Sequence, residues 1–171
     1  MKKIISILTA LFIMTAFSTT AFAAQSTDAD VSKPPISLSK EYNGQTLDKI
    51  NIENSIESRA WPGSGPAAQV TSVKIVDYGY LGPDFPGHEG NVGIVVQVMG
   101  HGRDYTTYDG VDIDYFRYDP IILTGTLVDG WYYYFDCGPA TVGTHQFKIR
   151  MVSHNSPYTE RTANFTLNIT E

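Results

Sequence analysis

The chain has 171 residues, of which 12 are basic and 18 acidic, so its formal net charge is −6. A surface of this sign argues against nucleic-acid binding, which requires basic side chains to neutralise phosphates, and against attachment to anionic lipid. Cys137 is the only cysteine, which excludes an internal disulfide, and it lacks the cationic neighbours that activate a thiol. The length corresponds to one domain with an appendage, because single domains cluster at about 100–150 residues.

The first residues have the pattern of an export signal. Lys2 and Lys3 form a basic start, residues 4–17 are mostly apolar, and Ala21-Phe22-Ala23 supplies the small residues that precede a cleavage site. A retained membrane helix is the alternative, but the apolar run is shorter than the stretch of about 20 residues that a bilayer requires. Residues 1–23 are therefore predicted to be a signal peptide. The mature protein is predicted to be extracellular, without stable membrane insertion.

Residues 24–69 differ in composition from the remainder of the mature chain. Ser, Thr, Asp, Asn, Lys and Glu dominate, and a Pro- and Gly-rich segment at 61–68 neither continues a helix nor enters a β-ladder. Apolar residues within 46–58 recur at the spacing of a short amphipathic helix. The region as a whole is predicted to be a polar leader and linker that is largely unstructured.

From Val70 onward, short apolar or alternating segments are separated by turns. One nearly continuous apolar run is typical of a central strand, and the last two segments alternate cleanly between apolar and polar residues. The predicted strands cover residues 70–78, 91–99, 111–115, 121–128, 131–135, 143–152 and 163–169. Residues 70–171 are therefore predicted to form a single antiparallel β-sandwich, all-β and immunoglobulin-like, with about seven strands.

Five consecutive aromatic residues at 131–135 follow Asp129-Gly130, a strong hairpin signal. Aromatic side chains suit a pleated, half-buried surface, so this run is predicted to be a strand. Its odd-numbered side chains share one face, which we assign to the core. Tyr132 and Tyr134 share the other face, which must lie under more protein, meet a ligand or stand on the surface.

Tyrosines are the main candidates for ligand binding, because aromatic rings with a polar tip stack on ligands at half-wet surfaces. All eleven tyrosines lie beyond the predicted signal peptide. The competing explanation is that a small β domain without disulfides uses these rings for bulk. The candidate ligand-binding residues are Tyr105, Tyr108, Tyr118, Tyr132, Tyr134 and His101.

The sequence lacks the motifs G-x-S-x-G, H-E-x-x-H and the P-loop, so no catalytic residue and no cofactor are predicted. Five aspartates at 104–119 are potential calcium ligands, but their spacing matches no EF-hand, and a turn at Asp109-Gly110 is the preferred explanation. His88, His101 and His154 lie in loops and would bind zinc only if they met at one end of the sandwich. No metal site is predicted.

Two resemblances to known families accompany these patterns. Residues 143–149 and 163–169 resemble the closing strands of extracellular immunoglobulin-like modules, in which a tyrosine commonly occupies the place of His145 and bonds back across the corner. Residues 99–110 and, more specifically, 128–136 resemble the YolA family of small secreted proteins from Bacillus and its relatives. That family is of unknown function. The resemblance therefore implies secretion and a compact domain but no catalytic residues.

These observations favour a secreted, non-enzymatic binding module directed at cell-wall or environmental polysaccharide or at an extracellular protein partner. A secreted enzyme of unrecognised type and a small toxin-like competition factor are the alternatives. An exposed aromatic strip would favour binding, whereas a pocket that gathers His and Asp side chains would favour an enzyme.

The export signal generates the first testable prediction. The mature protein should be recovered from the medium with an amino terminus near Ala24, because the small-residue pattern ends at Ala23. Amino-terminal sequencing of the secreted material checks this. A cell-bound product that still carries residues 4–17 would contradict it.

Overall fold

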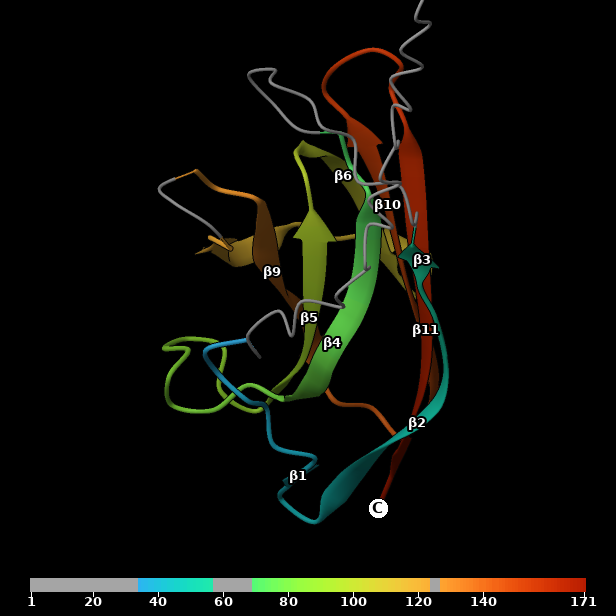
Figure 1. Cartoon of the computed structure of the whole chain (residues 1–171). Coiled ribbons are helices and arrows are strands. Elements are labelled where there is room, and N and C mark those ends of the chain that lie inside the picture. The colour runs from blue at the N-terminus through green and yellow to red at the C-terminus, as the bar shows by residue number, and fades with distance from the viewer. Residues whose placement is uncertain (1–33, 57–68, 124–126) are drawn as a thin grey trace, which may run out of the picture.

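The computed structural model describes residues 34–56, 69–123 and 127–171, within which every regular element is a β-strand (Figure 1). Two antiparallel sheets pack face to face. In spatial order, the five-stranded sheet contains β3 (Ser55–Ile56), β4 (Ser72–Tyr80), β5 (Asn91–Met99), β9 (Gly130–Pro139) and β8 (Tyr115–Ile121). The six-stranded sheet contains β1 (Glu41–Tyr42), β2 (Gln45–Glu53), β11 (Glu160–Thr170), β10 (Gly143–Ser153), β6 (Gly102–Tyr108) and β7 (Val111–Asp112).

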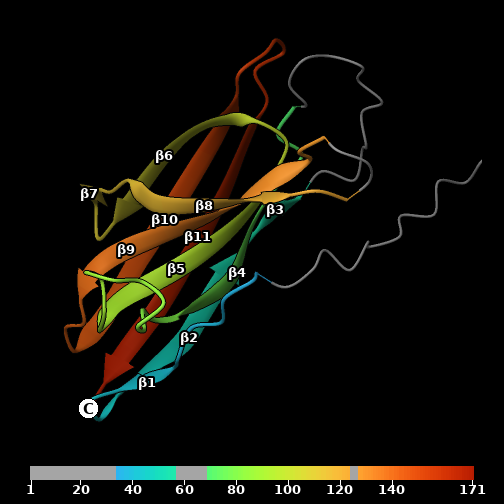
Figure 2. The same ribbon diagram turned by 90° about the vertical axis from the view of Figure 1, so that its left-hand side faces the viewer.

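This topology confirms the predicted immunoglobulin-like β-sandwich. The order β4-β5-β9-β8 in one sheet and β11-β10-β6 in the other matches the A-B-E-D and G-F-C strands of that fold. The chain changes sheet between β2 and β3, between β5 and β6, between β7 and β8, and between β9 and β10. Figure 2 shows β6 and β8 on the same margin of the sandwich. These seven strands correspond to the predicted number. The short β7 and the strands β1–β3 of the leader are additional.

The predicted signal peptide lies outside the described residues. No helix in the described ranges is long and apolar enough to cross a membrane.

The prediction of an unstructured leader is wrong for residues 34–56. Strand β2 pairs along β11, and Leu47 is buried in the core, so the predicted domain boundary at Val70 is too late. The proposed helix at 46–58 is likewise replaced by β2 and β3 where the chain is described. Asn43 and Gly44, with φ of 49° and 82°, form the two-residue turn between β1 and β2. This Asn-Gly pair is a hairpin signal, but the polar composition around it led to the prediction of an unstructured segment.

Two details between β8 and β9 also differ from the prediction. Strand β8 already ends at Ile121, so no strand covers residues 122–128 where the chain is described, and Asp129-Gly130 does not form a tight hairpin. Gly130 instead allows β9 to pack closely against β5, because a Cβ atom there would lie 2.2 Å from the Val98 carbonyl oxygen. Strand β6 was not predicted, since Gly100 and Gly102 interrupt the apolar pattern at its start.

The main core lies between the two sheets. Strands β5, β9, β10 and β11 supply most of its buried side chains, and Tyr133 and Phe135 belong to it as predicted. Their ring contacts extend across the interior, as between Phe135 and Phe147, whose centroids are 5.3 Å apart. The assignment of the odd-numbered face of β9 to the core is therefore confirmed for these two residues.

A second hydrophobic cluster covers the outer face of the five-stranded sheet. Tyr132 and Tyr134, predicted to contact ligand, are only 3% and 0% exposed because they belong to this cluster. Leu38 of the leader and Leu81 and Phe85 of the β4–β5 connection pack against them. The prediction of a ligand-binding platform at Tyr132 and Tyr134 is therefore wrong. Distant segments of the chain occupy the face that a ligand would need.

Burial on both faces of β9 makes a stability prediction. Tyr134→Ala and Phe135→Ala should each lower the free energy of unfolding by on the order of 3–5 kcal/mol, because both side chains are fully buried. Tyr118→Ala should cost less than about 1 kcal/mol, since that side chain is 54% exposed. Denaturant midpoints of the three variants provide the test. A small effect at Tyr134 alone would mean that the second cluster is loosely packed.

Candidate functional site

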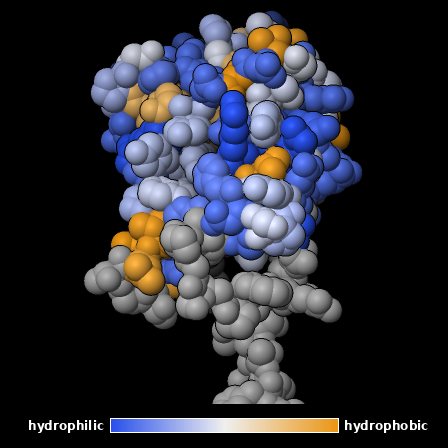
Figure 3. Space-filling model, turned by 90° about the horizontal axis from the view of Figure 1, so that it is seen from above, coloured by the Kyte–Doolittle hydropathy of each residue, from blue (hydrophilic) through white to orange (hydrophobic). Residues whose placement is uncertain are grey.

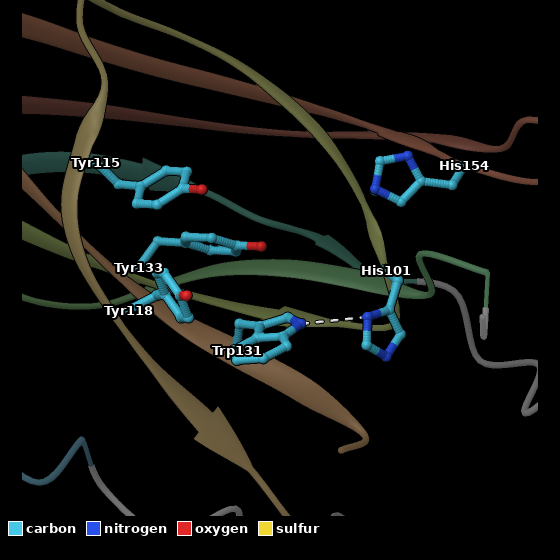
Figure 4. Close-up of a pocket in the computed structure, with 7 residues that line it drawn as sticks. His101, Tyr115, Tyr118, Trp131, Tyr133 and His154 are labelled. Carbon is cyan, nitrogen blue, oxygen red and sulfur yellow. Dashed lines mark hydrogen bonds between the residues drawn. The ribbon is translucent and has the colours of Figure 1, made fainter. Parts of the chain in front are cut away.

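A pocket of about 270 Å³ opens at one end of the sandwich, where β8 and β9 face the β5–β6 and β10–β11 connections (Figure 4). Its volume is near the lower limit of about 300 Å³ for small-molecule sites, so it fits one small ligand unit. The lining residues are His101, Gly102, Tyr115, Tyr118, Trp131, Tyr133 and His154.

One wall of the pocket is aromatic. Tyr115 and Tyr118 project from β8, and Trp131 and Tyr133 from the neighbouring β9. The rings of Tyr118 and Trp131 meet edge to face at a centroid distance of 5.2 Å, and those of Tyr115 and Tyr133 are 4.8 Å apart. Such contacts hold the rings in fixed orientations. In Figure 4 the hydroxyl ends of Tyr115 and Tyr133 point toward the histidine side of the pocket.

His101 forms part of the opposite wall, and its hydrogen bonds fix the orientation of its ring. The indole Nε1 of Trp131 donates to Nδ1 of His101 at 3.3 Å, so Nδ1 is the unprotonated nitrogen. Nε2 then carries the proton and donates to the carbonyl oxygen of Val128 at 3.1 Å. Because both nitrogens are engaged, the imidazole is held in one orientation.

Tyr133 is the most deeply placed hydroxyl of the pocket. Burial, followed by the neighbouring Tyr115 and the carboxylate of Asp104, raises the pKa of Tyr133 to about 12. The hydroxyl therefore stays protonated in neutral solution and is able to donate a hydrogen bond. Asp104 itself lies on the inner face of β6, where it accepts a hydrogen bond of 3.1 Å from the Thr106 hydroxyl.

The predicted ligand-binding residues are only partly brought together. His101 and Tyr118 line the pocket, whereas Tyr132 and Tyr134 are buried on the opposite face of β9. Tyr105 is exposed on the outer face of the six-stranded sheet. Tyr108 packs against the main core at the far end of β6, where its ring stacks on His145 at 5.5 Å.

Three aromatic residues and one histidine of the pocket were not predicted as ligand-binding candidates. Trp131 and Tyr133 were correctly placed on the inward face of β9, but that face opens into the pocket near the start of the strand. Tyr115 and His154 come from a strand start and a loop whose positions depend on the whole fold. The Tyr-x-x-Tyr spacing of Tyr115 and Tyr118 is the one sequence feature that indicates an aromatic site here.

A second polar site surrounds His145 at the start of β10. Nδ1 lies 2.7 Å from the Asp109 carboxylate and Nε2 lies 2.7 Å from the Thr141 carbonyl oxygen. The bond to Thr141, four residues upstream, takes the place of the tyrosine bond at the corner of immunoglobulin-like domains. Both partners are acceptors, so the doubly protonated ring satisfies both. Burial lowers the pKa of His145, but the Asp109 and Thr141 hydrogen bonds outweigh it and raise the pKa above 6.5.

The remaining predicted polar residues serve the fold. Asp109 adopts a φ of 50° in the turn with Gly110, in agreement with the preferred explanation for that aspartate. His88 pairs with Asp136 at 2.5 Å near the start of β5, at the opposite end of that strand from His101. The three loop histidines therefore do not meet, and among the described residues no group of three or more His, Cys, Asp or Glu side chains is placed to hold a metal ion.

Cys137 packs against the main core. Burial, then the nearby carboxylates of Asp136 and Asp109, raises the pKa of its thiol well above the ordinary value. The thiolate is therefore disfavoured, as expected for an inert cysteine.

Comparison with known proteins gives one match. Residues 86–167 are similar to a family described as a domain of unknown function (DUF4879). The matched segment runs from the β4–β5 connection into β11 and includes the seven described residues that line the pocket. No curated protein and no solved structure is detectably similar to the chain.

The His145 site generates a prediction on pH. Because the folded pKa lies above the unfolded value of 6.5, the stabilisation from protonated His145 is complete below pH 6.5 and is lost as the pH rises through the folded pKa. The free energy of unfolding should therefore fall as the pH increases from 6.5, and Asp109→Asn should flatten this dependence. Denaturant titrations across this range check it. The exposed His154→Gln is the control, and an unchanged slope in Asp109→Asn would contradict the assignment.

Proposed function

We propose that the protein is a secreted, non-enzymatic binding module, related to the YolA family, whose aromatic pocket holds one sugar unit of a polysaccharide. The single observation that carries this proposal is the aromatic wall formed by Tyr115, Tyr118, Trp131 and Tyr133. Secretion rests on the export signal of residues 1–23. The described residues that line the pocket all lie within the segment of the family match, residues 86–167.

The chemistry of the pocket suits a sugar. A pyranose ring has apolar C–H faces and a rim of hydroxyl groups, so it complements aromatic planes that carry polar tips. Tyr118 offers such a plane, being 54% exposed at the mouth. The protonated Tyr133 hydroxyl supplies a donor deeper in the pocket. The shape and polarity of the pocket thus favour a partly solvent-exposed ligand that stacks on an aromatic ring.

The same residues argue against catalysis at this site. Glycoside hydrolysis requires two opposed carboxyl groups, and none belongs to the described residues that line the pocket. His101 has both ring nitrogens engaged by Trp131 and Val128, so it is not free to act as a general base. The raised pKa of Tyr133 likewise disfavours a tyrosinate base. A binding role therefore fits the pocket better than an enzymatic role.

Substitution at the mouth of the pocket tests the proposal. Tyr118→Ala should weaken retention on the recognised polysaccharide about 10-fold, which corresponds to about 1.4 kcal/mol and to the loss of one aromatic contact. His101→Ala should also weaken retention, because it releases Trp131 from its orientation. Retention of the mature protein on a panel of immobilised cell-wall and soluble glycans provides the measurement.

Tyr42→Ala is the matched control, since Tyr42 is a half-exposed tyrosine on the short edge strand β1, outside the pocket. It should leave retention unchanged. Equal retention of the wild type, Tyr118→Ala and Tyr42→Ala would remove the pocket as the binding site, and no retention on any glycan would reject the proposed function.

A further inference from the structure

The outer face of the six-stranded sheet carries a cluster of cationic side chains next to the pocket. Strands β6 and β10 pair antiparallel, with Arg103 opposite Val152, Tyr105 opposite Arg150 and Thr107 opposite Lys148. Directly opposed residues share a face of the sheet at about 5 Å separation. Arg103, Tyr105, Arg150 and Lys148 therefore form one continuous surface, which we call the basic ladder.

Tyr105 organises the ladder. The guanidinium of Arg150 lies 4.5 Å from the centroid of the Tyr105 ring, and that of Arg103 lies 5.3 Å away. These cation–π contacts hold two positive charges at the surface in a defined arrangement. The ring itself is 45% exposed, so it also offers an aromatic surface between the charges.

The charges of the ladder are only partly compensated. Among the described residues, no carboxylate lies within ion-pair distance of Arg103 or Lys148. Arg150 contacts Glu160 at 3.4 Å, but both side chains are about half exposed, and such surface pairs are weak. Asp112, opposite Thr107 on β7, marks the border of the positive region. The ladder thus keeps a local excess of positive charge although the whole chain is acidic.

The ladder begins at the pocket. His101 and Gly102 line the pocket, and the next residue along the chain is Arg103. Alternation along β6 sends Asp104 inward and leaves Arg103 and Tyr105 on the outer face. The pocket and the ladder therefore meet at the start of β6, close enough for one polymer to contact both. Figure 3 shows mostly hydrophilic residues and small, separate hydrophobic patches at the end of the molecule seen from above, a surface that suits a polar polymer better than an apolar partner.

We propose that the ligand is an acidic polysaccharide, one sugar of which occupies the pocket while carboxylates further along the chain bind Arg103, Arg150 and Lys148. This inference rests on the proposed function and adds the charge of the ligand to it. Exposed ion pairs are individually weak and screened by salt, so the ladder contributes through several contacts at once.

Polygalacturonate and its fully methyl-esterified form provide the test, because they share one sugar backbone and differ in charge. The mature protein should bind the acidic form more tightly than the ester, and added salt should reduce this difference. The double variant Arg103→Gln/Lys148→Gln should weaken binding of the acidic form at least about 5-fold and leave binding of the ester unchanged. Lys49→Gln, an exposed lysine on β2, is the matched control and should bind as the wild type does.

The outcomes separate this inference from the proposed function. Equal binding of the two forms would overturn the inference and leave the pocket proposal standing. Inorganic polyphosphate that binds as tightly as polygalacturonate would also overturn it, since the ladder would then act as a simple ion exchanger. Binding of the acidic form that requires Arg103 and Lys148 but is unaffected by Tyr118→Ala would support the ladder and reject the pocket.

Discussion

Burial of strand β9 on both faces is the constraint on which the rest of the structure depends. Its odd-numbered aromatic side chains extend into the space between the sheets, and its even-numbered tyrosines require a cover on the outside. The second cluster provides that cover through Leu38 of the leader and Leu81 and Phe85 after β4. A strand of five successive large aromatic residues thus needs three layers: the covering segments, its own five-stranded sheet and the six-stranded sheet.

The cover is fixed by polar contacts as well as by apolar packing. Asp77 on β4 accepts a hydrogen bond from the Leu38 backbone at 2.8 Å and forms an ion pair with Lys40 at 2.8 Å. Gly79 permits the close approach, because a Cβ atom there would lie 2.3 Å from the Ser39 carbonyl oxygen. Residues 34–56 of the leader are therefore held by β4 near Leu38 and by β11 along β2. This part of the leader belongs to the folded domain.

Local sequence patterns predicted most of the sandwich but little of the candidate site. Alternation identified β10 and β11, and the continuous apolar run at 91–99 identified β5, because these signals depend only on neighbouring residues. The cover over Tyr134 depends on Leu38 and Phe85, which are far away in the chain, so periodicity could not reveal it. The pocket likewise depends on where β9 emerges from the core. No spacing within 131–135 shows that Trp131 and Tyr133 lie at that opening.

The position of β11 determines the order in which the six-stranded sheet is completed. This last strand lies between β2 and β10, and it pairs with a segment more than a hundred residues earlier in the chain. During synthesis, β2 can therefore pair only with the short β1 until β11 has been made. Such long-range pairing slows folding, because the loop must close before any contact compensates for its entropy. A chain that cannot complete its sheet early stays unfolded for longer. This delay would suit the proposed secretion, in which the chain would cross a membrane unfolded and fold on the other side.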